Sequence, residues 1–221
     1  RRSELLMRTD FSSTQSVNAP MKSARHEIVR WLLLALLVPA LVSVGCQRDS
    51  ESRLGEIRAL QQAGEFEASI EPTRVLLHTE PSHAEANYRL GVALVQTGRK
   101  GLAIWPLQKA SRSDLYAVQA GLILAGTLSM SESFQESIRA YTRVIEHDPN
   151  NTTAIFGLGR AQLSSGNPAA ALQSANRVLT LRPDDQRASA LKGSALLDLD
   201  RGDEAEATLK QVLDRAMAGE N

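Results

Sequence analysis

The sequence predicts an all-α fold, an α-solenoid of stacked helix-turn-helix hairpins, from three observations. Small and large apolar residues recur with a period of 34 residues over most of the chain. Pro81, Pro149 and Pro183 lie two periods and one period apart. Alanine and leucine are abundant while aromatic residues make up only 4% of the chain, which favours helices over sheets. A hairpin of this length cannot bury its apolar face alone, so successive hairpins stack and share one core.

The residues at fixed repeat positions are those that two antiparallel helices and a turn require. One position of the first helix is mostly tiny and lets backbones approach, with Ile57, Gly91, Ala125, Gly159 and Gly193. A position near its end is mostly leucine, with Leu60, Leu94, Leu128, Gln162 and Leu196. The turn position holds Gly64, Gly98 and Gly166, although Glu132 and Asp200 occupy it in two repeats. Glycine there closes the first helix in a left-handed conformation, and proline ends the second helix.

This pattern resembles the tetratricopeptide repeat, a 34-residue helical hairpin. The resemblance covers residues 50–219, which divide into units 50–83, 84–117, 118–151, 152–185 and 186–219. Three features depart from it. Pro72 and Pro106 share one position inside second helices, where we expect a tolerated early kink. The second unit has Leu115 in place of the closing proline, and the fifth unit is followed by no polar helix that would cap the stack.

The resemblance implies that the first helices line a concave groove, at repeat positions 2, 5, 9, 12 and 13. Positions 5 and 9 there predict an apolar and aromatic floor with arginine at its edges, formed by Arg58, Tyr88, Leu122, Phe156 and Arg160. Such a groove suits an extended peptide or an amphipathic helix with a few acidic groups. The alternative for Leu122, and for Leu54 at the same position, is that they pack between hairpins.

Chaperone-binding members of the family hold a C-terminal carboxylate with Lys and Asn at groove positions. This sequence has apolar or aromatic residues where those groups are expected, namely Tyr88, Val92, Leu122 and Ile123. We therefore expect no binding of chaperone tails.

An apolar run of 14 residues, Trp31–Val44, follows a basic stretch that begins at Met21. The run is shorter than the roughly 20 residues that cross a bilayer, but it has the length of the apolar part of a secretory signal. We therefore predict a signal peptide over residues 21–45. Residues 1–20 are polar, begin with Arg, and are interpreted as an upstream segment included by a misplaced start codon.

The run ends in Ser43-Val44-Gly45-Cys46, which resembles the lipobox of bacterial lipoproteins although Ser43 replaces the usual Leu. The resemblance implies lipidation of Cys46, with residues 46–49 as the modified cysteine and a short linker. The alternatives are an ordinary cleaved signal peptide with an incidental cysteine, or a short uncleaved anchor. Gln47 is not the Asp that retains lipoproteins in the inner membrane, so the resemblance favours the periplasmic face of the outer membrane.

The sequence contains no pattern that predicts catalysis, a cofactor or a metal. Cys46 is the only cysteine, so an internal disulfide and a multi-cysteine metal site are excluded. The four histidines form no ligand cluster, there is no HExxH motif, and no glycine-rich loop is suited to phosphate. The formal net charge is 0, which gives no indication of nucleic acid as a partner.

These observations predict a non-enzymatic, membrane-anchored scaffold that binds another protein in the bacterial cell envelope. In architecture it is similar to repeat lipoproteins that act in the assembly of type IV pili or secretion machines. The alternative from another class is the substrate-recruiting part of a larger enzyme, such as a sugar transferase, truncated at its C-terminus. A third interpretation is a homo-oligomer formed through the uncapped last repeat.

Overall fold

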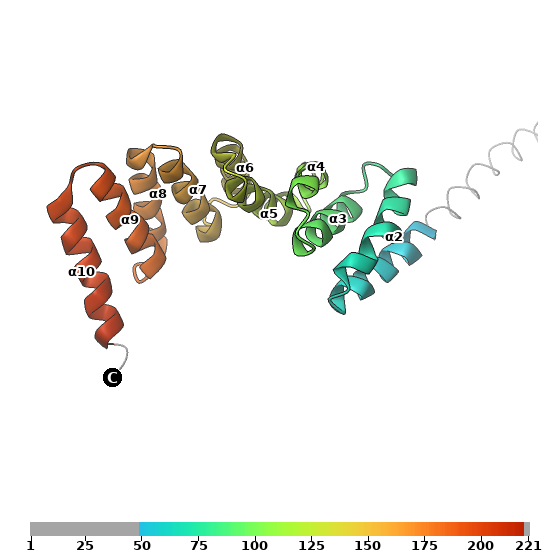
Figure 1. Cartoon of the computed structure of the whole chain (residues 1–221), viewed down its shortest axis with the longest axis horizontal. Helices are drawn as coiled ribbons and strands as arrows, with labels where there is room; N and C mark the ends of the chain where they lie inside the picture. The colour runs from blue at the N-terminus through green and yellow to red at the C-terminus, as the bar shows by residue number, and fades with distance from the viewer. Residues whose placement is uncertain (1–48, 219–221) are drawn as a thin grey trace, which may run out of the picture. The chain divides into compact units, whose positions relative to one another are not determined.

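A computed structural model describes residues 49–218, and every regular element in that range is an α-helix (Figure 1). The predicted all-α solenoid of helical hairpins is thereby confirmed. The upstream segment 1–20, the predicted signal peptide 21–45 and Cys46 lie outside the described residues. No helix among those described is long and apolar enough to cross a membrane.

The helices follow one another as hairpins. The first hairpin has a helix over residues 49–62 and then α2 (Phe66–Thr79). The next three are α3 (Ala84–Gln96) with α4 (Lys100–Ala110), α5 (Ala117–Met130) with α6 (Phe134–His147), and α7 (Thr152–Ser164) with α8 (Pro168–Leu181). The last is α9 (Gln186–Asp198) with α10 (Gly202–Ala218). Pro72 lies inside α2 and Pro106 inside α4, as the sequence indicated.

One face of the stack is formed by the first helix of each hairpin. Helix α3 contacts α5, α5 contacts α7 and α7 contacts α9, whereas no two second helices among α2, α4, α6, α8 and α10 contact each other. The first helices are therefore closer together, and their face is the concave one. We call the first helices, including residues 49–62, the inner helices, and the second helices the outer helices.

Every described hairpin turns through a residue with positive φ. Gly64, Gly98 and Gly166 have φ of 81°, 78° and 80°. Glu132 and Asp200 adopt the same conformation with φ of 59° and 58°, although a side chain makes this region unfavourable. The next N–H donates to the carbonyl of the recurring leucine of the inner helix, or of Gln162 in α7, as in Arg99 N to Leu94 O at 2.8 Å. This bond closes each inner helix.

Within the described residues, 50–218 form one compact unit with its own core. Leu54 and Ile57 pack against Leu76 in the first hairpin, and the central hairpins share a larger cluster that includes Leu107 and Val144. A Cβ at Gly91 would lie 2.5 Å from Leu107 Cδ2, so glycine is needed where that leucine crosses α3. The repeat array thus buries its apolar residues against its own helices.

Candidate functional site

Two hollows open on the inner face between α5 and α9, and they meet at Arg160 of α7. One, of about 280 Å³, lies between α5 and α7, and the other, of about 370 Å³, lies between α7 and α9. Arg160 and Ser164 line both of them. The Arg160 side chain is exposed and forms no ion pair within residues 49–218. Because neither lining includes a carboxylate, the shared wall is positively charged.

The first hollow has a tyrosine at its floor that comes from an outer helix. Tyr141 of α6 is buried and reaches between Gly126 of α5 and Gly157 of α7. A Cβ at residue 157 would overlap the Tyr141 ring, whereas a Cβ at residue 126 would lie 3.8 Å from its hydroxyl. Burial raises the pKa of Tyr141, although Arg160 opposes the shift. The floor therefore presents a neutral phenol, which can donate or accept a hydrogen bond.

The second hollow combines an aromatic ring with a second arginine. The Arg187 guanidinium lies over the Phe156 ring, 5.2 Å from its centroid, which is a cation–π arrangement. Arg187 also lies 3.3 Å from Asp185, which accepts the Ala188 N–H and caps α9. Burial alone would raise the pKa of Asp185, but the hydrogen bonds from Ala188 and Arg187 lower it below its usual value. Asp185 therefore stays ionised and partly offsets the charge of Arg187.

The inner face of the first two hairpins is different, because its charges pair with one another. Arg58 donates two hydrogen bonds of 2.7 Å to the Glu85 carboxylate and one of 2.7 Å to Glu51. Arg89 donates to the same Glu85 carboxylate at 2.8 Å. The hydrogen bonds from Arg58 lower the pKa of Glu85 to about 2. Tyr88 stacks on Tyr116, with ring centroids 5.1 Å apart, so its ring faces another part of the array.

The two regions use equivalent residue pairs. Arg58 and Glu85 stand at positions 9 and 2 of consecutive repeats, and Arg160 and Arg187 stand at the same positions three repeats, or 102 residues, further on. In the first pair a carboxylate neutralises the arginine. In the second pair arginine occupies the place of the carboxylate, and the cationic wall of the hollow results.

The structure thus separates the five residues that the sequence assigned to the groove. Phe156 and Arg160 line the hollows. Arg58 belongs to the ion-pair network, and Tyr88 to the aromatic stack. Leu122 is half-buried against the central core. Their roles in binding stay predictions, and the geometry favours Phe156 and Arg160.

Several residues of the hollows were not identified from the sequence, namely Met130, Tyr141, Leu163 and Arg187. Arg187 had a signal, because a step of three repeats from Glu85 leads to it. Tyr141 also had a signal, because it stands four residues after the small residue Ser137, where the repeat pattern places an aromatic side chain. Within residues 49–218 no group of three or more His, Cys, Asp and Glu side chains could hold a metal ion.

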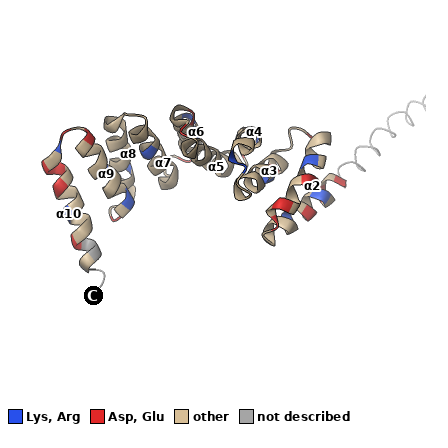
Figure 2. Cartoon of the chain, in the orientation of Figure 1, with Lys and Arg blue, Asp and Glu red and all other residues tan. Residues whose placement is uncertain are grey.

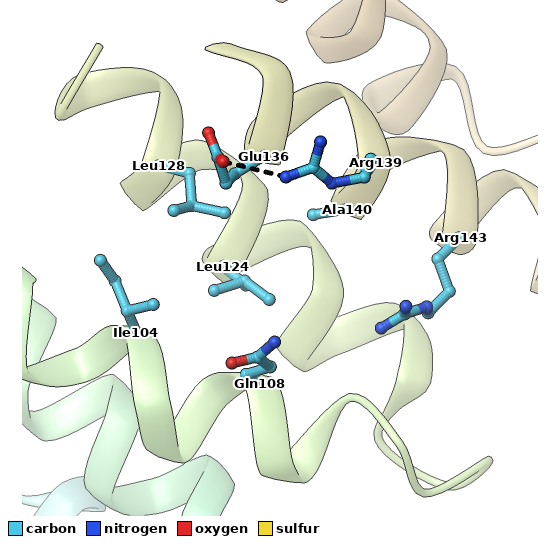
Figure 3. A pocket seen from close by; sticks show the side chains of 8 residues that line it. All are labelled: Ile104, Gln108, Leu124, Leu128, Glu136, Arg139, Ala140 and Arg143. Carbon is cyan, nitrogen blue, oxygen red and sulfur yellow. Dashed lines mark hydrogen bonds and ion pairs between the residues drawn. The ribbon is translucent and has the colours of Figure 1, made fainter. Parts of the chain in front are cut away.

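A third hollow, of about 200 Å³, lies between outer helices α4 and α6 (Figure 3). Its floor is apolar and its edges carry two arginines of α6, Arg139 and Arg143. Arg139 pairs with Glu136 at 2.9 Å, while Arg143 forms no ion pair with any residue in the described range. The floor is formed by Ile104, Leu124, Leu128 and Ala140.

Comparison with known proteins identifies the repeat. Models of the tetratricopeptide repeat match residues 54–117, 128–194 and 163–218. No curated protein matches the sequence.

Solved structures resemble the array in fold. A crystal structure of MamA protein is 24% identical, with a TM-score of 0.70 over 75% of this chain and 90% of that chain. MamA 41-end from Desulfovibrio magneticus RS-1 is 14% identical, with a TM-score of 0.70 over 78% of this chain and 97% of that one. YrrB, described as a TPR protein with an unusual peptide-binding site, is 20% identical, with a TM-score of 0.67 over 73% and 84%.

Proposed function

Because the chain belongs to the tetratricopeptide repeat family, we propose that it is a non-enzymatic scaffold that holds a segment of another protein on inner helices α5, α7 and α9. The observation that carries this proposal is the pair of hollows that meet at Arg160, with apolar and aromatic walls, two arginines and no carboxylate in their lining. The peptide-binding site named for YrrB, which has a similar fold, supports a peptide as the bound group.

The chemistry of the hollows defines the segment that fits them. Each hollow can take one aliphatic or aromatic side chain, against Met130 in the first and against Phe156 and Leu163 in the second. A carboxylate placed between Arg160 and Arg187 would accept charge-assisted hydrogen bonds, each contributing about 1.5–3 kcal/mol. We therefore propose an extended segment or amphipathic helix with an acidic residue between two apolar ones.

A mutant pair tests this site. The change Arg160→Ala/Phe156→Ala removes a cation and an aromatic wall on the inner face, and we expect it to abolish recovery of crosslinked partners from envelope extracts. Arg177→Ala removes an arginine from outer helix α8 of the same hairpin and should leave recovery unchanged. Equal recovery of the same partner by both variants, each with a wild-type melting temperature, contradicts the proposal.

We further propose that lipidated Cys46 anchors the array at the periplasmic face of a bacterial envelope membrane, the outer one, where it supports assembly of a surface or secretion machine. The apolar run Trp31–Val44 followed by Gly45 and Cys46 supports the anchor. A lipidated cysteine carries several acyl chains, which hold a protein stably because each buried CH₂ contributes about 0.8 kcal/mol.

The anchor has its own experiment. Cys46→Ser should move the protein from the membrane to the soluble envelope fraction and remove the acyl mass from the intact protein. A wild-type protein without acyl mass, or a mutant that stays in membranes as fully as the wild type, contradicts lipid anchoring. Neither result depends on the inner-face groove.

A further inference from the structure

The outer face of α4 exposes two large apolar side chains next to each other. Leu102 is 60% and Trp105 is 62% exposed, and they lie one helical turn apart. Lys109 follows on the same side, with its ammonium 5.7 Å from the centroid of the Trp105 ring. We call Leu102, Trp105, Lys109 and the following Arg112 the α4 patch. The opposite side of the helix, with Ala103 and Leu107, is buried in the core.

The chain segment that contains the α4 patch carries charges of one sign. Residues 86–113 contain five Lys and Arg and no Asp or Glu. Arg89 and Arg99 pair with Glu85 and Glu67. The three others, Lys100, Lys109 and Arg112, form no ion pair with any described residue.

Acidic residues lie elsewhere on the array. Figure 2 shows several acidic residues on α10. Helix α4, by contrast, carries lysine and no acidic residue. The acidic residues close to the patch include Glu80, which adjoins the Pro81 carbonyl that accepts from Lys109, Asp114 in the turn after α4, and Glu136 on α6. Glu136 is already paired with Arg139, and Arg143 of the adjoining hollow adds a further cation to this side.

We propose that the α4 patch docks on an anionic membrane surface. Trp105 and Leu102 would enter the interfacial region, where an amphipathic aromatic ring is favoured, and Lys109 and Arg112 would contact lipid phosphates. Lys109 donates one hydrogen bond to the Pro81 carbonyl at 2.9 Å, and its ammonium has two further N–H donors for a phosphate. Each cation near an anionic surface strengthens binding about fivefold.

A second copy of the chain fits this surface less well than a membrane does. A twofold contact would place Lys109 and Arg112 close to the same residues of the other copy, and these like charges repel. A stable interface also needs about 800 Å² per partner, far more than two side chains supply. Membrane docking would leave the inner-face groove open, because the α4 patch belongs to an outer helix.

Vesicle binding tests the proposal with the fragment 47–221, which contains the whole compact array and keeps Trp105 as its single tryptophan. Vesicles of phosphatidylethanolamine and phosphatidylglycerol should shift the Trp105 emission to shorter wavelength and co-sediment the fragment, whereas vesicles of phosphatidylcholine should do neither. Leu102→Ser/Trp105→Ser should lower the partition coefficient at least about tenfold. Lys109→Gln/Arg112→Gln should lower it about 25-fold and weaken its dependence on salt.

The control is Leu197→Ser/Leu213→Ser, which removes side chains that are 54% and 59% exposed at the other end of the array, near Glu206 and Asp214. It should change the partition coefficient less than twofold. Absence of an emission shift with anionic vesicles at low salt overturns the proposal, as does a loss of binding in the control equal to that in the patch variants. A larger shift with poly-glutamate than with vesicles would assign the patch to an acidic protein instead.

Discussion

The inner face of the first two hairpins and that of the last three are built from the same repeat positions, but they differ in what remains available to a partner. Over residues 49–62 and α3, Arg58 and Arg89 share the Glu85 carboxylate and Tyr88 stacks on Tyr116. Over α7 and α9, Arg160 has no carboxylate partner within the described chain, and hollows lie on both sides of it. We call the first region, whose charges are paired, the closed region, and the second, where we propose that a partner binds, the open region.

One residue makes this difference. Position 2 of the following repeat is Glu85 in the first case and Arg187 in the second. Glu85 is held by two arginines, so its hydrogen bonds are satisfied before any ligand arrives. In the second case Asp185 partly offsets the charge of Arg187, and Arg160 has no ion-pair partner among residues 49–218, so a bound anion could pair with it. In repeats of one architecture, the sign of a single side chain thus decides whether the arginine at position 9 is neutralised or remains available.

The largest expected effect comes from giving the second region the charge pair of the first. In Arg187→Glu the new carboxylate should pair with Arg160 and also repel an acidic segment. We expect partner affinity to fall about 100-fold, or about 3 kcal/mol, while thermal stability is kept. Titration calorimetry with the recovered partner measures the affinity.

The neutral variant Arg187→Gln separates the two causes. It removes one cation without adding a carboxylate, so we expect an intermediate loss of about tenfold. Unchanged affinity in both variants would mean that Arg187 takes no part in binding and that the comparison between the regions carries no functional meaning.

A glycine substitution tests the floor of the open region. Gly157→Ala places a methyl group against the buried Tyr141 ring, so the ring or helix α7 has to shift. Overpacking of this kind should lower the free energy of unfolding by up to about 3 kcal/mol. Gly126→Ala meets only the Tyr141 hydroxyl, at 3.8 Å, and should be tolerated. Urea denaturation compares them, and equal stability of the two variants contradicts the described packing.

The ion pairs of the closed region should make the free energy of unfolding depend on pH. The pKa of Glu85 is lowered to about 2 in the folded chain, below its ordinary value. As the pH falls, Glu85 is therefore protonated in the unfolded chain before it is protonated in the folded chain. The stabilising effect of the Glu85 carboxylate is complete above about pH 5 and is lost as the pH falls towards 2. Glu85→Gln should cost about 2 kcal/mol at pH 7 and flatten the acid dependence. An unchanged urea midpoint at pH 7 would show that the network is not stabilising.

The smallest expected effect concerns the hairpin turns. Both hairpins of the closed region turn through glycine, Gly64 and Gly98, whereas two of the three hairpins of the open region turn through Glu132 and Asp200 with positive φ. Glu132→Gly or Asp200→Gly relieves this conformation and should stabilise the array by about 1 kcal/mol. The reverse change, Gly98→Glu, should destabilise it by a similar amount. A fall in melting temperature for both glycine variants contradicts the argument.

The fold and part of the site were predictable because they depend on short segments. Helix formation, the left-handed turn and the 34-residue period follow from which residues occur at each repeat position, and Phe156 and Arg160 were found in the same way. The lipidation of Cys46 also follows from a short segment, and it stays a prediction because Cys46 lies outside the described residues.

Tertiary structure alone decided which of these positions a partner could reach. Arg58 and Arg160 occupy equivalent positions, and only the contact across the repeat boundary distinguishes a neutralised arginine from an available one. Only packing brings the ring of Tyr141 from an outer helix to the inner face, and only packing buries half of Leu122. The repeat pattern records which residues a helix presents, whereas the distance and angle between neighbouring helices determine which side chains meet.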